Sequence, residues 1–145
     1  LVGRLMFLVD TNVWLEILLE QKRVREARAF LEAVPPGGVA ISEFSLYSIG
    51  LILTRLRQDA LFKDFITDVL ENGAVQRIFL DSDGLKELLA AQRKYGLDFD
   101  DAYQYVAARK AGHILVSFDG DLDKTDIGRE APAQALTRSL REKIL

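Results

Sequence analysis

The stretch that decides the fold is LDFDDAYQYVAARKAGHILVSFDGDLD, residues 97–123. Residues 98–111 predict a helix, because acids stand where it begins and Gly112 stands where it ends. Residues 113–117 form an apolar run that is typical of a buried strand, and Asp119 follows shortly after it. A helix that leads directly into a neighbouring strand runs antiparallel to it. We therefore expect the acids at the helix start to lie beside the end of the strand.

The rest of the chain repeats this alternation of strand and helix. Short apolar runs predict strands at residues 6–9, 39–41 and 75–80. Helical spacing of apolar residues predicts helices from residue 12 onward and at residues 23–34, 45–57, 61–71 and 82–95. The pattern weakens past Asp121, where no further element is predicted. Strands separated by helical crossovers favour a central parallel sheet between two helical layers, which is a three-layer α/β/α fold.

Length and composition fit one globular domain. The chain has 145 residues, of which 49% are hydrophobic and 28% are charged, close to the average for folded domains. We assign residues 6–145 to this domain. Residues 1–5 precede the only methionine, Met6, and we interpret them as an extension that adds nothing to the fold.

Several classes of function are excluded by the composition. The chain has 19 Lys and Arg against 22 Asp and Glu, so its net charge of −3 argues against nonspecific coating of nucleic acid but leaves nucleic acid open as a substrate. With no cysteine and a single histidine, His113, it cannot build a disulfide, a thiolate zinc site or a two-histidine metal motif. The first apolar run stops at Asp10, too early for a membrane span. We expect a cytoplasmic protein without membrane contact, whose metal chemistry would use carboxylates.

Acidic residues occur where the predicted strands end. Asp10 follows the first strand, Asp119 follows the last, and Asp98, Asp100 and Asp101 open the helix between them. Ligands of open parallel sheets bind beyond the carboxyl ends of the strands. Carboxylates that share a small space repel one another unless divalent cations neutralise them, and oxygen ligands favour Mg²⁺ or Mn²⁺. Such ions support cleavage of phosphodiester bonds, so these residues predict a metal-dependent phosphodiesterase.

Each acid also has a purely structural explanation. Asp98 and Asp101 stand at a helix start, where acids cap the helix and interact favourably with its dipole. Asp119 and Asp121 fit a polar turn after a strand. Asp10 is harder to explain in this way, because a charge at the end of a buried strand is costly unless it is paired or bound to metal. The functional interpretation therefore depends on whether these acids converge.

Three stretches carry a resemblance to a known family: FLVDTNVWLE (7–16), LDFDDAYQYVAARKAG (97–112) and ILVSFDGDLD (114–123). The chain resembles PIN-domain ribonucleases, particularly the toxin subunits of VapBC-type toxin–antitoxin pairs, over nearly its whole length from Met6 onward. The resemblance implies a three-layer fold, Mg²⁺ or Mn²⁺ as cofactor, RNA as substrate, an antitoxin as protein partner and a homodimer.

The resemblance also implies roles for particular residues. Asp10, Asp101 and Asp119 would be both catalytic residues and metal ligands, Asp98 and Asp121 would be further metal ligands, and supporting roles would fall to Thr11, Asn12 and Ser117.

One position departs from the family pattern. The family places a Glu within the helix after the second strand, and in AISEFSLYSIGLIL (40–53) that position falls on Ser48. The nearest acid is Glu43, at the start of the same helix, which either takes over the catalytic role or is a surface cap residue. Without Glu43 the site has three main acids, and weaker metal binding would follow.

Two rival functions remain at this point. A noncatalytic or degenerate PIN-like interaction module is favoured by Ser48 in place of the Glu. An aspartyl-phosphate phosphatase would need a second Asp two residues after Asp10, where the chain has Asn12.

The apolar helices at 45–57 and 61–71 are expected in the core, or alternatively at a dimer surface or an antitoxin groove.

Overall fold

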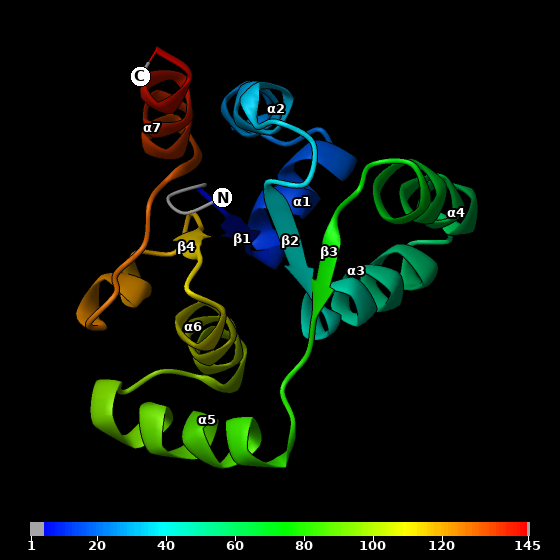
Figure 1. The fold of residues 1–145 in the computed structure, drawn as a ribbon. Coiled ribbons are helices and arrows are strands. Elements are labelled where there is room, and N and C mark those ends of the chain that lie inside the picture. The colour runs from blue at the N-terminus through cyan, green and yellow to red at the C-terminus, as the bar shows by residue number, and fades with distance from the viewer. Residues whose placement is uncertain (1–4, 145) are drawn as a thin grey trace.

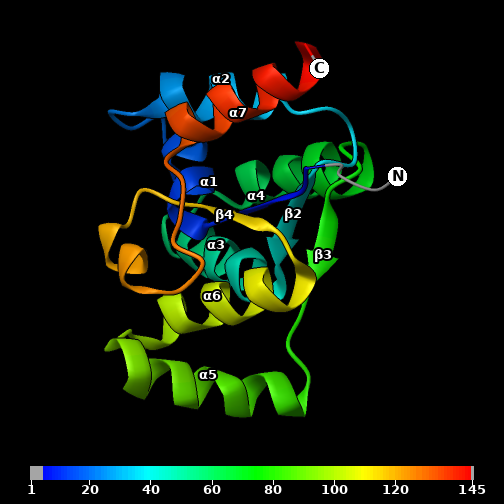
Figure 2. The same ribbon diagram turned by 60° about the vertical axis from the view of Figure 1, so that its left-hand side comes forward.

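A computed structural model describes residues 5–144 and shows a parallel sheet between two layers of helices (Figure 1, Figure 2). Within these residues the sheet has the strand order β3-β2-β1-β4, with every neighbouring pair parallel. The strands are β1 (Phe7–Val9), β2 (Val39–Ser42), β3 (Gln76–Ile78) and β4 (Ile114–Val116). The predicted three-layer α/β/α fold class is confirmed. Residues 1–4, most of the extension expected from the sequence, and residue 145 lie outside the described residues.

The helices divide between the two faces of the sheet. One face is covered by α1 (Thr11–Leu18), α2 (Val24–Ala33), α3 (Glu43–Arg55), α4 (Asp59–Phe65) and α7 (Pro132–Ile144), and the other by α5 (Ser82–Tyr95) and α6 (Phe99–Ala111). The strands alternate between the two cores: Phe7 and Val9 pack with the first group, whereas Leu8 packs with α5 and α6. Because helices cover both faces, β1, β2 and β4 are almost continuously apolar, which is why short apolar runs predicted them correctly. β3 lies at the edge of the sheet, and its Gln76 and Arg77 are exposed.

The predicted helix over residues 61–71 differs from the structure in its second half. α4 ends at Phe65, and the chain continues as a π-helix, η1 (Ile66–Glu71). In a π-helix each backbone hydrogen bond spans five residues instead of four. The spacing of apolar residues does not reveal this change.

The chain after Asp121 contains structure that the sequence analysis did not predict. A 3₁₀ helix, η2 (Gly120–Lys124), follows β4, and α7 packs against α2. Between them, the Glu130 N–H donates to the Leu115 carbonyl at 2.8 Å, and the Ser117 N–H donates to the Glu130 carbonyl at 3.0 Å. This pairing extends the sheet beyond β4 and fixes the loop that follows it.

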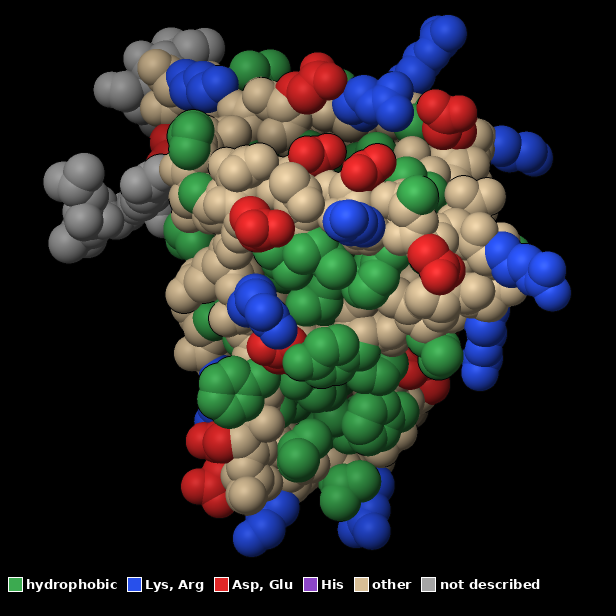
Figure 3. All heavy atoms as spheres, turned by 90° about the vertical axis from the view of Figure 1, so that its right-hand side faces the viewer, with side chains coloured by type: hydrophobic (Ala, Val, Ile, Leu, Met, Phe, Trp, Pro, Cys, Tyr) green, Lys and Arg blue, Asp and Glu red, His purple; other side chains and the backbone are tan. Residues whose placement is uncertain are grey.

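The side of the molecule that carries α4 exposes hydrophobic side chains over a broad area (Figure 3). A surface groove between α2, η1 and β3 is lined by apolar side chains, among them Trp14, Leu31, Val34, Val69 and Val75. Of the two apolar helical stretches, α3 contributes Ile49 and Leu53 to the core and leaves Tyr47 and Leu51 exposed. Within residues 5–144, no helix combines the length and the apolar character needed to cross a membrane.

Candidate active site

Two central strands and one helix bring the acidic residues together. β1 pairs with β4 in the register Val9↔Val116, so Asp10 and Ser117, which follow these strands, lie side by side. α6 begins at the same edge of the sheet. The resulting pocket has a volume of about 380 Å³ and is lined by Asp10, Thr11, Asn12, Leu15, Phe44, Ser48, Leu51, Ile52, Asp98, Asp100, Asp101 and Asp119.

Asp10 lies at the buried base of this pocket, with 6% of its surface exposed. Its Oδ1 accepts hydrogen bonds from the Thr11 N–H at 2.7 Å and from Gln104 Nε2 at 3.1 Å, and its Oδ2 accepts one from Ser117 Oγ at 2.7 Å. Burial raises the pKa of Asp10, whereas the hydrogen bond from Ser117 acts in the opposite direction. The hydrogen bonds fix the direction in which the carboxylate points.

Asn12 and Ser117 connect the turn after β1 to the turn after β4. Asn12 Nδ2 donates to Ser117 Oγ at 3.1 Å, and Asn12 Oδ1 accepts from the Phe118 N–H at 3.1 Å. Ser117 Oγ also accepts a hydrogen bond from the Asp119 N–H at 2.9 Å. The two turns are therefore held as one unit, which keeps Asp119 on the same side of the sheet as Asp10.

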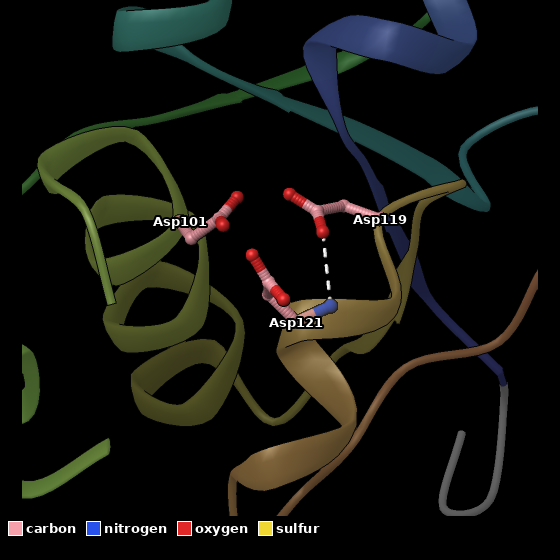
Figure 4. A group of neighbouring side chains, drawn as sticks. All are labelled: Asp101, Asp119 and Asp121. Carbon is pink, nitrogen blue, oxygen red and sulfur yellow. Dashed lines mark hydrogen bonds between the residues drawn. The ribbon is translucent and has the colours of Figure 1, made fainter. Parts of the chain in front are cut away.

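Asp101, Asp119 and Asp121 point toward one another (Figure 4). One carboxylate oxygen of each lies within 4.8 Å of those of the other two. Asp101 comes from the first turn of α6, where Asp98 Oδ1 caps the helix by accepting from the Asp101 N–H at 2.9 Å. Asp119 Oδ1 accepts from the Asp121 N–H at 2.9 Å at the start of η2. Asp98 and Asp119 therefore accept hydrogen bonds at helix starts, as expected, and Asp101, Asp119 and Asp121 still converge.

The convergence leaves the pocket with unbalanced negative charge. Burial, together with the nearby carboxyls of Asp119, Asp98 and Asp10, raises the pKa of Asp101 to about 8. Burial and the charge of Asp98 raise the pKa of Asp100 as well. A bound cation would relieve this repulsion, and the carboxylate oxygens that the cluster offers suit a hard cation such as Mg²⁺ or Mn²⁺.

Glu43 is the one proposed catalytic acid that the structure does not bring to the pocket. Its carboxylate pairs with Arg77 Nη2 of β3 at 2.8 Å, and this contact lowers the pKa of Glu43. Ser48 lines the pocket instead. The two residues are five positions apart on α3, which places them about 140° apart around the helix axis. Glu43 therefore cannot replace a carboxylate at position 48 from where it stands.

Gln104 is a site residue that the sequence analysis missed. It is fully buried on α6, and its Nε2 donates to Asp10 Oδ1 and to Ser45 Oγ. It lies three residues after Asp101, on the same face of the helix. An amide in the otherwise apolar stretch AYQYVAA was the signal that could have identified it.

Comparisons with known proteins agree with this architecture. A family model described as PIN domain matches residues 7–128. Three solved structures share the fold. A toxin–antitoxin complex from Klebsiella pneumoniae has a TM-score of 0.69 and 22% identity, covering 86% of this chain and 96% of that chain. The structure of FitAB bound to a DNA fragment has a TM-score of 0.72 and 20% identity, covering 88% and 96%.

The third is the VapC20 toxin of Mycobacterium tuberculosis, described as cleaving the sarcin–ricin loop. It has a TM-score of 0.66 and 22% identity, covering 79% of this chain and 91% of that chain. No curated protein matches the chain. At these identities the structural likeness supports the fold, and the chemistry has to be argued from the pocket.

Proposed function

The chain belongs to the PIN domain family, and from that premise we propose that it is a ribonuclease that cleaves RNA phosphodiester bonds with the help of Mg²⁺ or Mn²⁺. We further propose that it is the toxin of a toxin–antitoxin pair, in keeping with the structures that share its fold. An RNA substrate and a co-expressed antitoxin would place its action in the cytoplasm.

The observation that carries this proposal is the convergence of Asp101, Asp119 and Asp121 beside the buried Asp10. Carboxylates offer the oxygen ligands that Mg²⁺ and Mn²⁺ prefer. When bound, such an ion lowers the pKa of a water molecule and stabilises the charge that develops on a phosphate during hydrolysis.

The residues of the chain divide into ligands and positioning groups. Asp10, Asp101 and Asp119 would hold the cation, with Asp98 and Asp121 as further carboxylates at the rim. Thr11, Ser117 and Gln104 donate hydrogen bonds to Asp10, and Asn12 ties Ser117 to the following turn. Because Ser48 replaces a carboxylate, we expect weaker metal binding than a four-acid site would give.

The direct test uses purified Asp10→Asn and Asp101→Asn variants on a fluorescent RNA with Mn²⁺. Both variants should stay folded and lose cleavage, because each lacks a charged ligand of the cation. Glu43→Gln is the matched control: it also removes one acid, but its carboxylate pairs with Arg77 away from the pocket, so cleavage should persist. Undiminished cleavage by Asp10→Asn would refute the assignment.

The alternative that a specific observation favours is a noncatalytic interaction module, because Ser48 stands in the pocket where a fourth acid is usual. Calorimetric titration with Mn²⁺ separates the two functions: the absence of binding at millimolar metal would favour the module.

The phosphatase alternative has less support, since Asn12 is occupied in hydrogen bonds to Ser117 and the Phe118 backbone. It predicts an acyl phosphate on Asp10, which we do not expect to be found.

We propose that an antitoxin binds the apolar groove between α2, η1 and β3, and that the chain forms a homodimer. The apolar lining of the groove supports an antitoxin there, since exposed apolar patches mark protein partners. The broad hydrophobic surface on the side of the molecule that carries α4 supports a further protein contact, such as the homodimer (Figure 3). Val69→Asp would place a charge in the groove and should abolish co-purification with the product of an adjacent gene. Sedimentation of the chain alone tests the homodimer.

A further inference from the structure

The loop that carries Asp119 and Asp121 is held by an arginine that follows it in the chain. Arg129 Nη1 donates to the Ser117 carbonyl at 3.1 Å. The same guanidinium pairs with Asp123, through Nε to Oδ1 at 3.2 Å and through Nη2 to Oδ2 at 3.3 Å. Residues 117 and 123 are the two ends of this acidic loop, and both acids of the cluster lie between them. One side chain therefore connects the two ends of the acidic loop.

Arg129 is itself fixed in place by the pairing of its neighbour with the sheet. The Glu130 N–H donates to the Leu115 carbonyl at 2.8 Å, and the Glu130 carbonyl accepts from the Ser117 N–H at 3.0 Å. The Arg129 side chain is only 19% exposed. Its Nη2 lies 3.6 Å from the place that a Cβ on Gly120 would occupy, so the guanidinium packs against the middle of the acidic loop. From this position a planar guanidinium can reach two acceptors at once.

Charge repulsion works against the shape of the acidic loop. Asp119 and Asp121 point toward Asp101 of α6, so their charges push the loop away from that helix (Figure 4). The helical part of the loop, η2, is a short 3₁₀ segment, whose hydrogen bonds have poorer geometry than those of an α-helix. Leu122 is fully buried and anchors the middle of the loop, but an apolar contact does not fix the direction of the backbone on either side of it.

We propose that Arg129 is a positioning residue for the cation site, because it holds the acidic loop so that Asp119 and Asp121 face Asp101 before a cation binds. This inference rests on the proposed metal-dependent function and adds a residue that acts through the loop. Ligands that are fixed in advance cost less free energy to order on binding. Loss of Arg129 should therefore weaken cation binding. Charge alone predicts the opposite, because removing a positive charge beside an acidic site strengthens its attraction for a cation.

Calorimetric titration with Mn²⁺ tests these opposite signs, in variants whose folding is checked by circular dichroism. Arg129→Ala should weaken Mn²⁺ binding about tenfold, the lower end of the usual loss when a group that orients metal ligands is removed. Arg129→Lys should weaken it almost as much, because an ammonium keeps the charge but lacks the planar fork that reaches Ser117 and Asp123 together. Arg138→Ala is the matched control: it also removes an arginine paired with one acid, Glu130, and should not weaken binding.

Asp123→Ala tests the other end of the contact. The Asp123 side chain is 59% exposed, so its loss should leave the fold intact. The variant should bind Mn²⁺ more weakly than the wild type, but less weakly than Arg129→Ala, because the bond from Arg129 to Ser117 remains. Added to Arg129→Ala, it should have no further effect. If Asp123 acted only as a negative charge, it would lower the affinity by the same factor in both backgrounds, and the proposal would be wrong.

Amide exchange in EDTA examines the acidic loop without any metal. The Asp121 N–H donates to Asp119 Oδ1 at 2.9 Å, and in Arg129→Ala it should exchange severalfold faster than in the wild type. The Gly84 N–H is the internal reference, since it donates to Asp81 Oδ1 at 2.8 Å in a similar cap at the start of α5, and its rate should not change. An Asp121 rate that stays the same would contradict the proposal.

The outcomes distinguish this inference from the function on which it rests. If the wild type binds no Mn²⁺, the proposed cation site is itself wrong. If the wild type binds Mn²⁺ and Arg129→Ala binds it equally well or more tightly, the cation site stands and the positioning role is wrong. If Arg129→Ala loses RNA binding while its Mn²⁺ affinity is unchanged, the arginine contacts RNA, and the positioning role is again wrong.

Discussion

Asp101 shows how strongly the neighbours of one side chain can alter its chemistry. It is buried among other carboxyls, and its pKa is raised to about 8. The folded protein therefore keeps a proton on this carboxyl at pH values where the unfolded chain has released it. Since the folded state binds more protons, the stability of the metal-free protein falls as pH rises from about 4 to about 8.

Asp101→Asn should remove this pH dependence. At pH 8 in EDTA, we expect the variant to be more stable than the wild type by roughly 1 to 2 kcal/mol, because the amide carries no charge to repel Asp119. At pH 5 the difference should shrink, because the wild-type carboxyl is then protonated in the fold. Urea unfolding at the two pH values measures both quantities, and equal stabilities at pH 8 would contradict the expectation.

Gln104 is the second residue whose environment yields a prediction. Gln104→Leu would remove a buried donor from both Asp10 and Ser45, leaving their oxygens without this partner. We expect a loss of stability of about 1 to 3 kcal/mol, together with weaker Mn²⁺ binding in calorimetry. Gln92→Leu is the control: Gln92 makes one longer bond, 3.4 Å, to the Leu97 carbonyl, and its loss should cost less.

At the scale of elements, local sequence explains most strands and helices, but it does not explain the start of α7 or the π-helix η1. Strand ends and helix caps are encoded locally, which is why the acids at 10, 101 and 119 could be expected near one another before the structure was known. The start of α7 is different. Glu26 Oε2 of α2 accepts the Ala133 N–H at 3.0 Å, so part of this helix cap comes from residues 107 positions away. The π-helix η1 likewise has no local signal.

Glu26→Ala should therefore loosen α7. We expect a loss of about 1 kcal/mol in the free energy of unfolding, typical of a lost helix cap, and faster amide exchange in the first turn of α7. Glu32→Ala removes an exposed acid from the same helix, α2, and should change neither quantity. Equal exchange rates in the two variants would show that the Glu26 contact does not hold α7.

At the scale of the whole molecule, the acids of the pocket come from parts of the chain that only folding brings together. A cation held by Asp10, Asp101 and Asp119 would bind the folded state and not the unfolded chain. A ligand of this kind stabilises a protein by mass action. Metal binding and folding should therefore be coupled.

Mn²⁺ at about 100 times its dissociation constant should stabilise the wild type by about 2.7 kcal/mol and raise Tm by several degrees. EDTA should reverse the shift, and Asp119→Asn should show much less of it. Thermal unfolding followed by circular dichroism measures this. A wild type whose Tm is unchanged by millimolar Mn²⁺ would argue against a cation site in this pocket.

The pairing of β1 with β4 has a consequence for the cell that makes this chain. Ser117 and Asp10 meet in the folded protein although they are 107 residues apart. Every unfinished polypeptide on a ribosome therefore carries the first acid without the last, until β4 has emerged and docked. If the enzyme is harmful to its host, translation itself delays the harm, and fragments that stop before residue 114 should be inert.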